Sequence, residues 1–228
     1  MNEDLQAKTP AFYTLDGFDG ALAQRMIPAL HDASQDRTAS WTALVTNEPA
    51  LLDRLTSQGI ENPEAYGTIS WDHATLLFTS AMAITSEHLP LQVGERLTRE
   101  RFGRFPHKDG SALEYFLEYI RPNRSITEND GGDMYERIIT LLTQLCEGLT
   151  EAHQGHTHYE SGFGGLQLLG YLTREEVSDL RKLLAGRSWT VSYDEPFDGG
   201  IADVAKHFTT LLKAAERRAV GLVHRRHR

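Results

Sequence analysis

Histidine side chains are concentrated in one short segment of the chain, which has the sequence EAHQGHTHYE. His153, His156 and His158 lie within six positions of one another, and Glu151 and Glu160 flank them. On an extended chain, residues two apart project to the same side, so His156 and His158 could both reach one ion. Imidazole and carboxylate ligands together suit zinc or another divalent metal. One hypothesis is therefore a metal-dependent hydrolase that uses the three histidines. The alternative is a solvated helix end, because the spacing matches neither HExxH nor a zinc finger.

A second segment combines arginines with aromatic rings, a pattern used by proteins that bind single-stranded nucleic acid. Phe102 and Phe105 lie within or beside a group of four arginines, Arg96, Arg99, Arg101 and Arg104. Glu95 and Glu100 lie in the same segment and oppose this interpretation. A nucleic-acid-associated protein that uses the Arg96–Arg104 segment and the basic C-terminus is therefore an alternative. The competing interpretation is a solvated helix or loop whose charges are partly paired.

A third segment, YDEPFD, places acidic residues beside aromatic rings. Asp194, Glu195 and Asp198 share this segment with Tyr193 and Phe197. Proline and aspartate at these positions predict an exposed turn. The segment is the predicted contact with a protein partner. The alternative is that Asp198 only caps the final helix while the other two carboxylates are solvated.

The charge of the chain indicates which partner would suit that contact. The formal net charge is −9, and residues 1–216 carry −14 because residues 217–228 hold five arginines and no acid. An acidic body disfavours nonspecific binding to nucleic acid and favours a basic partner. The same acidity could simply keep the protein soluble.

Nucleophilic catalysis and covalent crosslinks have little support in the sequence. The chain has one cysteine, Cys146, so no intrachain disulfide can form, which is typical of a reducing compartment such as the cytoplasm. Cys146 falls in an apolar helical pattern with Leu142, Leu145 and Leu149, where a thiol packs as a small hydrophobe. The polar start of the chain is not typical of a signal peptide, and no apolar run suits a membrane span. We therefore expect no cofactor and no membrane contact.

Hydrophobic periodicity predicts the elements that would position these segments. Helices are predicted at residues 21–31, 48–57, 71–85, 111–120, 134–153, 173–184 and 198–212. Short strands are predicted at residues 11–15, 189–193 and 219–223, and a turn at 16–20. The prediction is an α+β fold, a predominantly helical single domain with a small sheet of short strands. The domain covers 11–224 with a candidate mobile loop at 121–132, a flexible tail at 1–10 and a basic tail at 225–228.

The C-terminal third has an order of motifs that resembles a known group. GYLTREEVSDLRKLL at Gly170–Leu184 contains a capping box and an amphipathic helix. It is followed by a strand, the acidic turn YDEPFDGG, the helix IADVAKHFTTLLKAAERR and the apolar segment VGLV. Residues 163–224 thereby resemble the YfbM-like group of small bacterial proteins of unknown function. The resemblance implies an α+β fold and a bacterial source, and it carries over no catalytic residue.

The leading hypothesis from the sequence is a non-enzymatic bacterial interaction protein. A specific form of it is an immunity or antitoxin-like protein whose acidic surface meets a basic protein. The sequence leaves the oligomeric state open.

Overall fold

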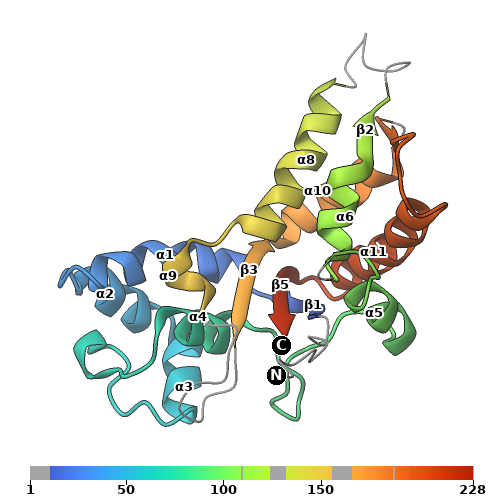
Figure 1. Cartoon of the computed structure of the whole chain (residues 1–228). Helices are drawn as coiled ribbons and strands as arrows, with labels where there is room; N and C mark the ends of the chain where they lie inside the picture. Colours follow the sequence, from blue (N-terminus) through green and yellow to red (C-terminus); the bar gives the residue numbers. More distant parts are fainter. Residues whose placement is uncertain (1–10, 109, 124–131, 156–165, 187, 228) are drawn as a thin grey trace, which may run out of the picture.

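A small antiparallel sheet lies at the centre of the molecule, and its middle strand is the last in the sequence. The computed structural model describes residues 11–108, 110–123, 132–155, 166–186 and 188–227. The strand order is β1-β5-β3 (Figure 1). The three strands are β1 (Phe12–Phe18), β3 (Gln167–Leu172) and β5 (Gly221–His227). Pairing of β1 with β5 runs from Phe12 opposite His227 to Phe18 opposite Gly221, so the sheet joins distant parts of the chain.

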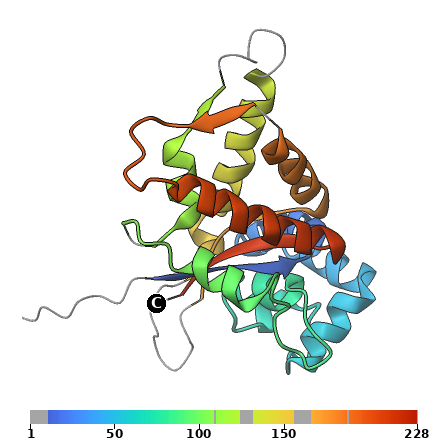
Figure 2. The same cartoon turned by 90° about the vertical axis from the view of Figure 1, so that its right-hand side faces the viewer.

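One face of the sheet is covered by a layer of helices that forms the first hydrophobic core. Leu222 points into this core, together with Phe208 and Leu211 of the long amphipathic helix α11. Figure 2 shows α11 running across the molecule in front of this layer. The helices of the layer are α5 (Arg96–Gly103), α6 (Ala112–Tyr119), α8 (Gly132–Glu147), α10 (Arg174–Ala185) and α11 (Gly200–Arg217).

The opposite face of the sheet is covered by the helices that follow β1. Val223, the neighbour of Leu222, points into this second core with Met26 and Trp41. Adjacent residues of a strand project to opposite faces, so β5 contributes to both cores. The elements of this layer are α1 (Gly20–Ala33), α2 (Ala39–Asn47), α3 (Pro49–Ser57), η1 (Tyr66–Thr68), α4 (His73–Ala81) and α9 (Glu151–Gln154).

A β-bulge lets strand β3 serve both cores as well. Its pairing with β5 passes from Leu168 opposite Arg225 directly to Gly170 opposite His224, so one residue is left out of register. One extra residue reverses which side chains face each core. Leu168 therefore packs in the second core and Leu172 in the first, although they are four positions apart.

A second sheet lies at the far end of the first layer. It consists of β2 (Ile120–Pro122) and β4 (Trp189–Val191), which pair antiparallel with Arg121 opposite Thr190. Strand β4 leads into the connection to α11, and this connection protrudes from the molecule at the left of Figure 2.

The predicted fold class is confirmed, since the described chain is mostly helical with a small antiparallel sheet. The capping box at Thr173 and Glu176 is present, with both of its reciprocal hydrogen bonds. Ser111 caps α6, because its side chain accepts a hydrogen bond from the amide of Glu114. None of the helices in the described ranges has the length and apolar character needed to cross a membrane.

Several predicted boundaries were wrong. The helix predicted at 134–153 ends at Glu147, and the short helix α9 follows after a turn. Gly148 makes that turn, where a Cβ atom would lie only 2.1 Å from the carbonyl oxygen of Gln144. Helix α2 was not predicted, because its apolar residues do not form a clear stripe.

Both ends of the domain also differ from the prediction. The predicted turn at 16–20 was wrong, because residues 16–18 belong to β1 and Gly20 begins α1, which leaves only Asp19 between them. The predicted basic tail at 225–228 was wrong for Arg225, Arg226 and His227, which form the end of β5. Their partners are the residues of β1 and β3, so the ordering depends on tertiary contacts. The predicted tail at 1–10 lies outside the described residues, and so does most of the predicted loop at 121–132. At the start of that loop, Arg121 and Pro122 belong to β2.

Candidate functional site

The acidic residues predicted to contact a partner lie in the connection between β4 and α11, here called the acidic loop (residues 192–199). Tyr193 is fully exposed at 101%, and Asp194 and Asp198 are exposed beside it. Phe197 is 38% exposed. Tyrosine is one of the residue types enriched at protein-binding sites.

Glu195 has a structural role that the sequence did not reveal. Its Oε1 atom accepts a hydrogen bond from the hydroxyl of Tyr115 at 2.8 Å and another from the amide of Ile201. The N-cap position of α11 is Gly199, which has no side-chain cap. Glu195 therefore supplies the capping carboxylate that the alternative interpretation assigned to Asp198, and it fixes the base of the acidic loop. Burial and the Glu195 carboxylate raise the pKa of the Tyr115 hydroxyl.

Aromatic rings support the acidic loop from below. Phe197 lies 5.7 Å from Tyr115 and 6.1 Å from Phe105 between ring centroids. His107 and Tyr119 also contact Tyr115, at 4.8 Å each. The packed rings and the Glu195 hydrogen bonds thus anchor the base of the acidic loop to α6 and α11.

The structure brings part of the basic segment close to the acidic loop. A shallow hollow of about 400 Å³ is lined by Arg101 and Arg104 on one side and by Phe197 and Asp198 on the other. The guanidinium of Arg104 lies over the ring of Phe12 at 5.0 Å. Acidic and basic residues therefore share this surface.

The other arginines of the basic segment have partners within the protein. Arg96 pairs with Glu100 at 2.7 Å, and Arg99 donates to Gln92. Phe102 and Phe105 are 2% and 7% exposed, so their rings belong to the core and do not form a surface on which bases could stack. The nucleic-acid alternative remains a prediction that rests on charge alone.

Of the three clustered histidines, the structure describes His153. It lies in α9 and is 3% exposed, with Nδ1 at 2.9 Å from the hydroxyl oxygen of Thr150 and with no partner for Nε2. Burial, followed by the charge of nearby His73, lowers its pKa to about 4. His156 and His158 lie outside the described residues, so the predicted metal site stays a prediction.

His153 packs against a second histidine that sequence spacing did not connect with it. The rings of His153 and His73 are stacked with centroids 5.2 Å apart. Nε2 of His73 lies 2.8 Å from the hydroxyl of Tyr66. Within the described ranges, no group of three or more His, Cys, Asp or Glu residues is placed to hold a metal ion.

A buried ion pair on the central sheet was also missed. Arg225 Nε lies 2.7 Å from Asp16 Oδ2, and the Asp16 side chain is only 2% exposed. The hydroxyl of Thr14 donates to the same oxygen at 2.8 Å, and the ring of Phe78 lies 4.8 Å from the guanidinium of Arg225. No local signal joins residues that are 209 positions apart.

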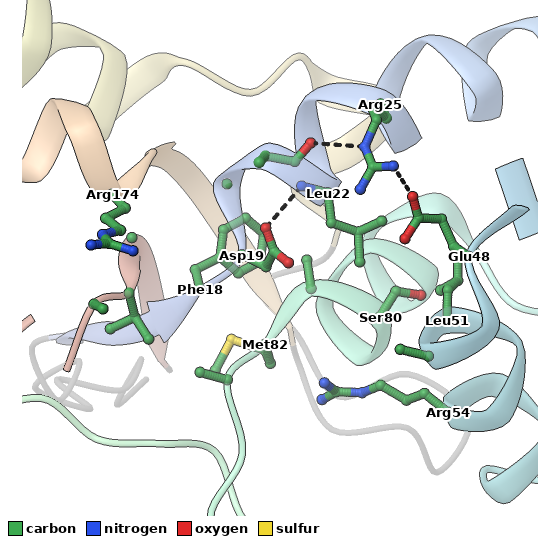
Figure 3. A pocket seen from close by; sticks show the side chains of 18 of the residues that line it. Phe18, Asp19, Leu22, Arg25, Glu48, Leu51, Arg54, Ser80, Met82 and Arg174 are labelled. Atoms are coloured by element: carbon green, nitrogen blue, oxygen red, sulfur yellow. Dashed lines mark hydrogen bonds and ion pairs between the residues drawn. The ribbon is translucent and has the colours of Figure 1, made fainter.

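A cavity of about 490 Å³ lies where α1, α3, α4, α10 and the start of β5 meet (Figure 3). Gly20 and Gly221 allow these segments to meet closely. A Cβ atom at Gly20 would lie 2.8 Å from the Cα of Thr173, and one at Gly221 would lie 2.3 Å from the carbonyl oxygen of Leu172. The cavity thus lies at the junction between the two helical layers, a common location for ligand sites.

Three arginines line this cavity: Arg25, Arg54 and Arg174. None of them was predicted as a site residue from the sequence. A usable signal was present on α3, where Leu51, Arg54 and Leu55 fall on one helix face. A charged residue on the buried face of a helix is uncommon, so Arg54 could have been singled out from this pattern.

No protein-family model, curated protein or solved structure matches the chain. The resemblance of residues 163–224 to the YfbM-like group therefore stays a prediction.

Proposed function

We propose that this protein is a non-enzymatic interaction protein that binds a basic protein partner through the acidic loop. A bacterial source, a cytoplasmic location and an immunity or antitoxin-like role are parts of this proposal. The observation that carries it is the exposed Tyr193 between Ser192 and Asp194, on a loop whose base is anchored by Glu195.

The geometry favours binding for two physical reasons. Tyrosine gives a large contact area with few rotatable bonds, so it loses little entropy when it is immobilised. The hydrogen bonds of Glu195 order the loop in the free protein, which reduces the cost of ordering it in a complex. Asp194 and Asp198 are exposed, so they can steer a positively charged surface toward Tyr193.

The first experiment identifies the partner by crosslinking it to position 193 of this protein. A photo-crosslinking amino acid replaces Tyr193 in the source cells, and the same amino acid replaces exposed Asp53 as a control. We expect one basic protein to be captured at position 193 and not at position 53. Equal capture at the two positions, or capture of an acidic protein, would contradict the proposal.

The second experiment measures association of the purified partner. The on-rate should fall steeply between about 50 and 500 mM salt, as the Debye length shrinks from roughly 14 Å to about 4 Å. The off-rate should change far less, because it reports short-range contacts.

Charge variants then test the loop directly. Asp194→Asn with Asp198→Asn should slow association roughly threefold at low salt, and the difference should vanish at high salt. The matched control is Asp53→Asn with Glu87→Gln, which removes the same charge at exposed positions elsewhere. An on-rate that both double variants lower equally would show that only net charge matters. Glu195 is left unchanged, because its loss would also disturb α11.

A further inference from the structure

Three arginines and three carboxylates, Asp19, Glu48 and Glu175, line the cavity of Figure 3. Two of the carboxylates and one of the arginines have partners within the protein. Arg25 forms an ion pair with Glu48 on the neighbouring helix. The Asp19 carboxylate accepts a hydrogen bond from the amide of Leu22 at 2.9 Å and caps α1. These two carboxylates are therefore already engaged by the protein itself.

Arg54 is another of the three arginines that line the cavity. Its side chain is half-buried and extends from α3 across the cavity in the direction of Met82 (Figure 3). Among the described residues, no ion pair or hydrogen bond engages its guanidinium. Burial lowers the pKa of Arg54 below its ordinary value, and no nearby carboxylate opposes this effect. The guanidinium lines the cavity without a protein partner, so an external anion in the cavity can pair with it.

Ser80 provides an independent observation on the same cavity. The residue is 3% exposed, lines the cavity and has no hydrogen-bond partner for its Oγ atom. In Figure 3 its hydroxyl projects from α4 toward α3, the helix that carries Arg54. Buried hydroxyls usually have a hydrogen-bond partner, so the Oγ atom of Ser80 retains the capacity to bond to a polar group of a ligand.

Two further features of the walls suit an anion. Gly20 and Ala21 lie in the first turn of α1 and line the cavity, and the first amides of a helix have no carbonyl partner within it. Arg174 lines the opposite side, in the first turn of α10, where the helix dipole does not favour a cation. The rest of the wall includes apolar side chains such as Leu51 and Met82.

We propose that this cavity binds a small organic anion, with its carboxylate or phosphate group against Arg54 and Ser80 and its apolar part against Met82 and Leu51. The cavity volume of about 490 Å³ suits a small molecule. Arginine matches the planar oxygen pairs of both groups, so the guanidinium defines the shared chemistry. This site is separate from the acidic loop and does not depend on the partner proposed for it.

Calorimetry with simple probes tests the proposal. Phenyl phosphate and phenylacetate represent the two anions, and 2-phenylethanol is the neutral control of similar size. We expect saturable binding of at least one anion below about 10 mM and weaker binding of the alcohol. The anion that binds more tightly identifies the headgroup class. Failure of both anions to bind, or equal binding of the neutral alcohol, would overturn the proposal.

Variants locate the bound anion. Arg54→Gln should weaken binding about tenfold or more, whereas Arg101→Gln removes an exposed arginine outside the cavity and should leave the affinity unchanged. Arg54→Lys keeps the charge without the planar fork and should give an intermediate affinity. Ser80→Ala should weaken binding severalfold without reducing the stability of the free protein, because it removes an unsatisfied hydroxyl.

Chemical-shift mapping on the wild-type protein locates the bound anion even if a variant misfolds. The largest amide shifts on addition of the tighter anion should fall at Gly20, Ala21 and Ser80. Shifts centred elsewhere, or an affinity that Arg54→Gln does not change, would remove this cavity as the binding site.

Discussion

His224 should make the stability of this protein fall as the solution becomes acidic. The residue lies in β5, is 1% exposed, and its Nδ1 lies 3.3 Å from the carbonyl oxygen of Leu145. Nε2 has no partner, and the ring lies 5.4 Å from that of Tyr13. Burial lowers the pKa of His224 from its ordinary value of 6.5 to about 4, although the hydrogen bond to Leu145 partly opposes the shift.

The sign and size of the effect follow from proton linkage. Well above pH 6.5 the ring is neutral in both the folded and the unfolded protein, so it contributes no pH dependence there. As the pH falls toward 4, the unfolded chain binds a proton at this site and the folded protein does not. Stability is therefore lost across this window, and between pH 7 and pH 5 the loss from His224 alone is about 1.8 kcal/mol.

Urea unfolding at pH 7 and pH 5 tests this prediction for the wild type and for His224→Gln. The glutamine side chain keeps an amide N–H donor but does not titrate. The free energy of unfolding should fall by about 1.8 kcal/mol less in the variant than in the wild type. His88→Asn, at an exposed turn, is the control and should behave as the wild type. The same pH dependence in the His224 variant and the wild type would refute the reasoning.

Three further predictions concern packing and backbone. Asp16→Asn breaks the buried ion pair with Arg225 and should lower the free energy of unfolding by about 3 kcal/mol in urea titrations. Adding Arg225→Met should restore part of this loss, and no loss in Asp16→Asn would show that the pair does not stabilise the fold. Cys146 is buried, and burial raises the pKa of its thiol. The thiol should therefore react slowly with a thiol reagent in the native protein and rapidly in denaturant, and fast labelling of the native protein would contradict this. Ala219 follows the C-cap of α11 and has φ of 54°, a left-handed conformation that favours glycine. Ala219→Gly should therefore raise stability by about 1 kcal/mol in thermal unfolding, and a decrease would argue against strain there.

The sequence by itself determined the features that depend on near neighbours. The capping box at Thr173 was predicted, because it depends on residues three positions apart. The place of Cys146 on the apolar face of its helix followed from the spacing of its neighbouring leucines. The predominantly helical α+β class followed from the same local periodicity. The acidic loop was placed correctly between a strand and the final helix, although Glu195 and not Asp198 caps that helix.

Tertiary structure alone decided how distant segments combine. Arg225 was predicted in a tail and Asp16 in a turn, yet they form a buried pair because β5 lies against β1. The unpaired state of Arg54 depends equally on three-dimensional placement, since Glu48 is engaged by Arg25 from another helix. Local sequence sets backbone preference, whereas burial and charge pairing depend on which segments pack together. Those contacts join residues far apart in the chain, and no local pattern encodes them.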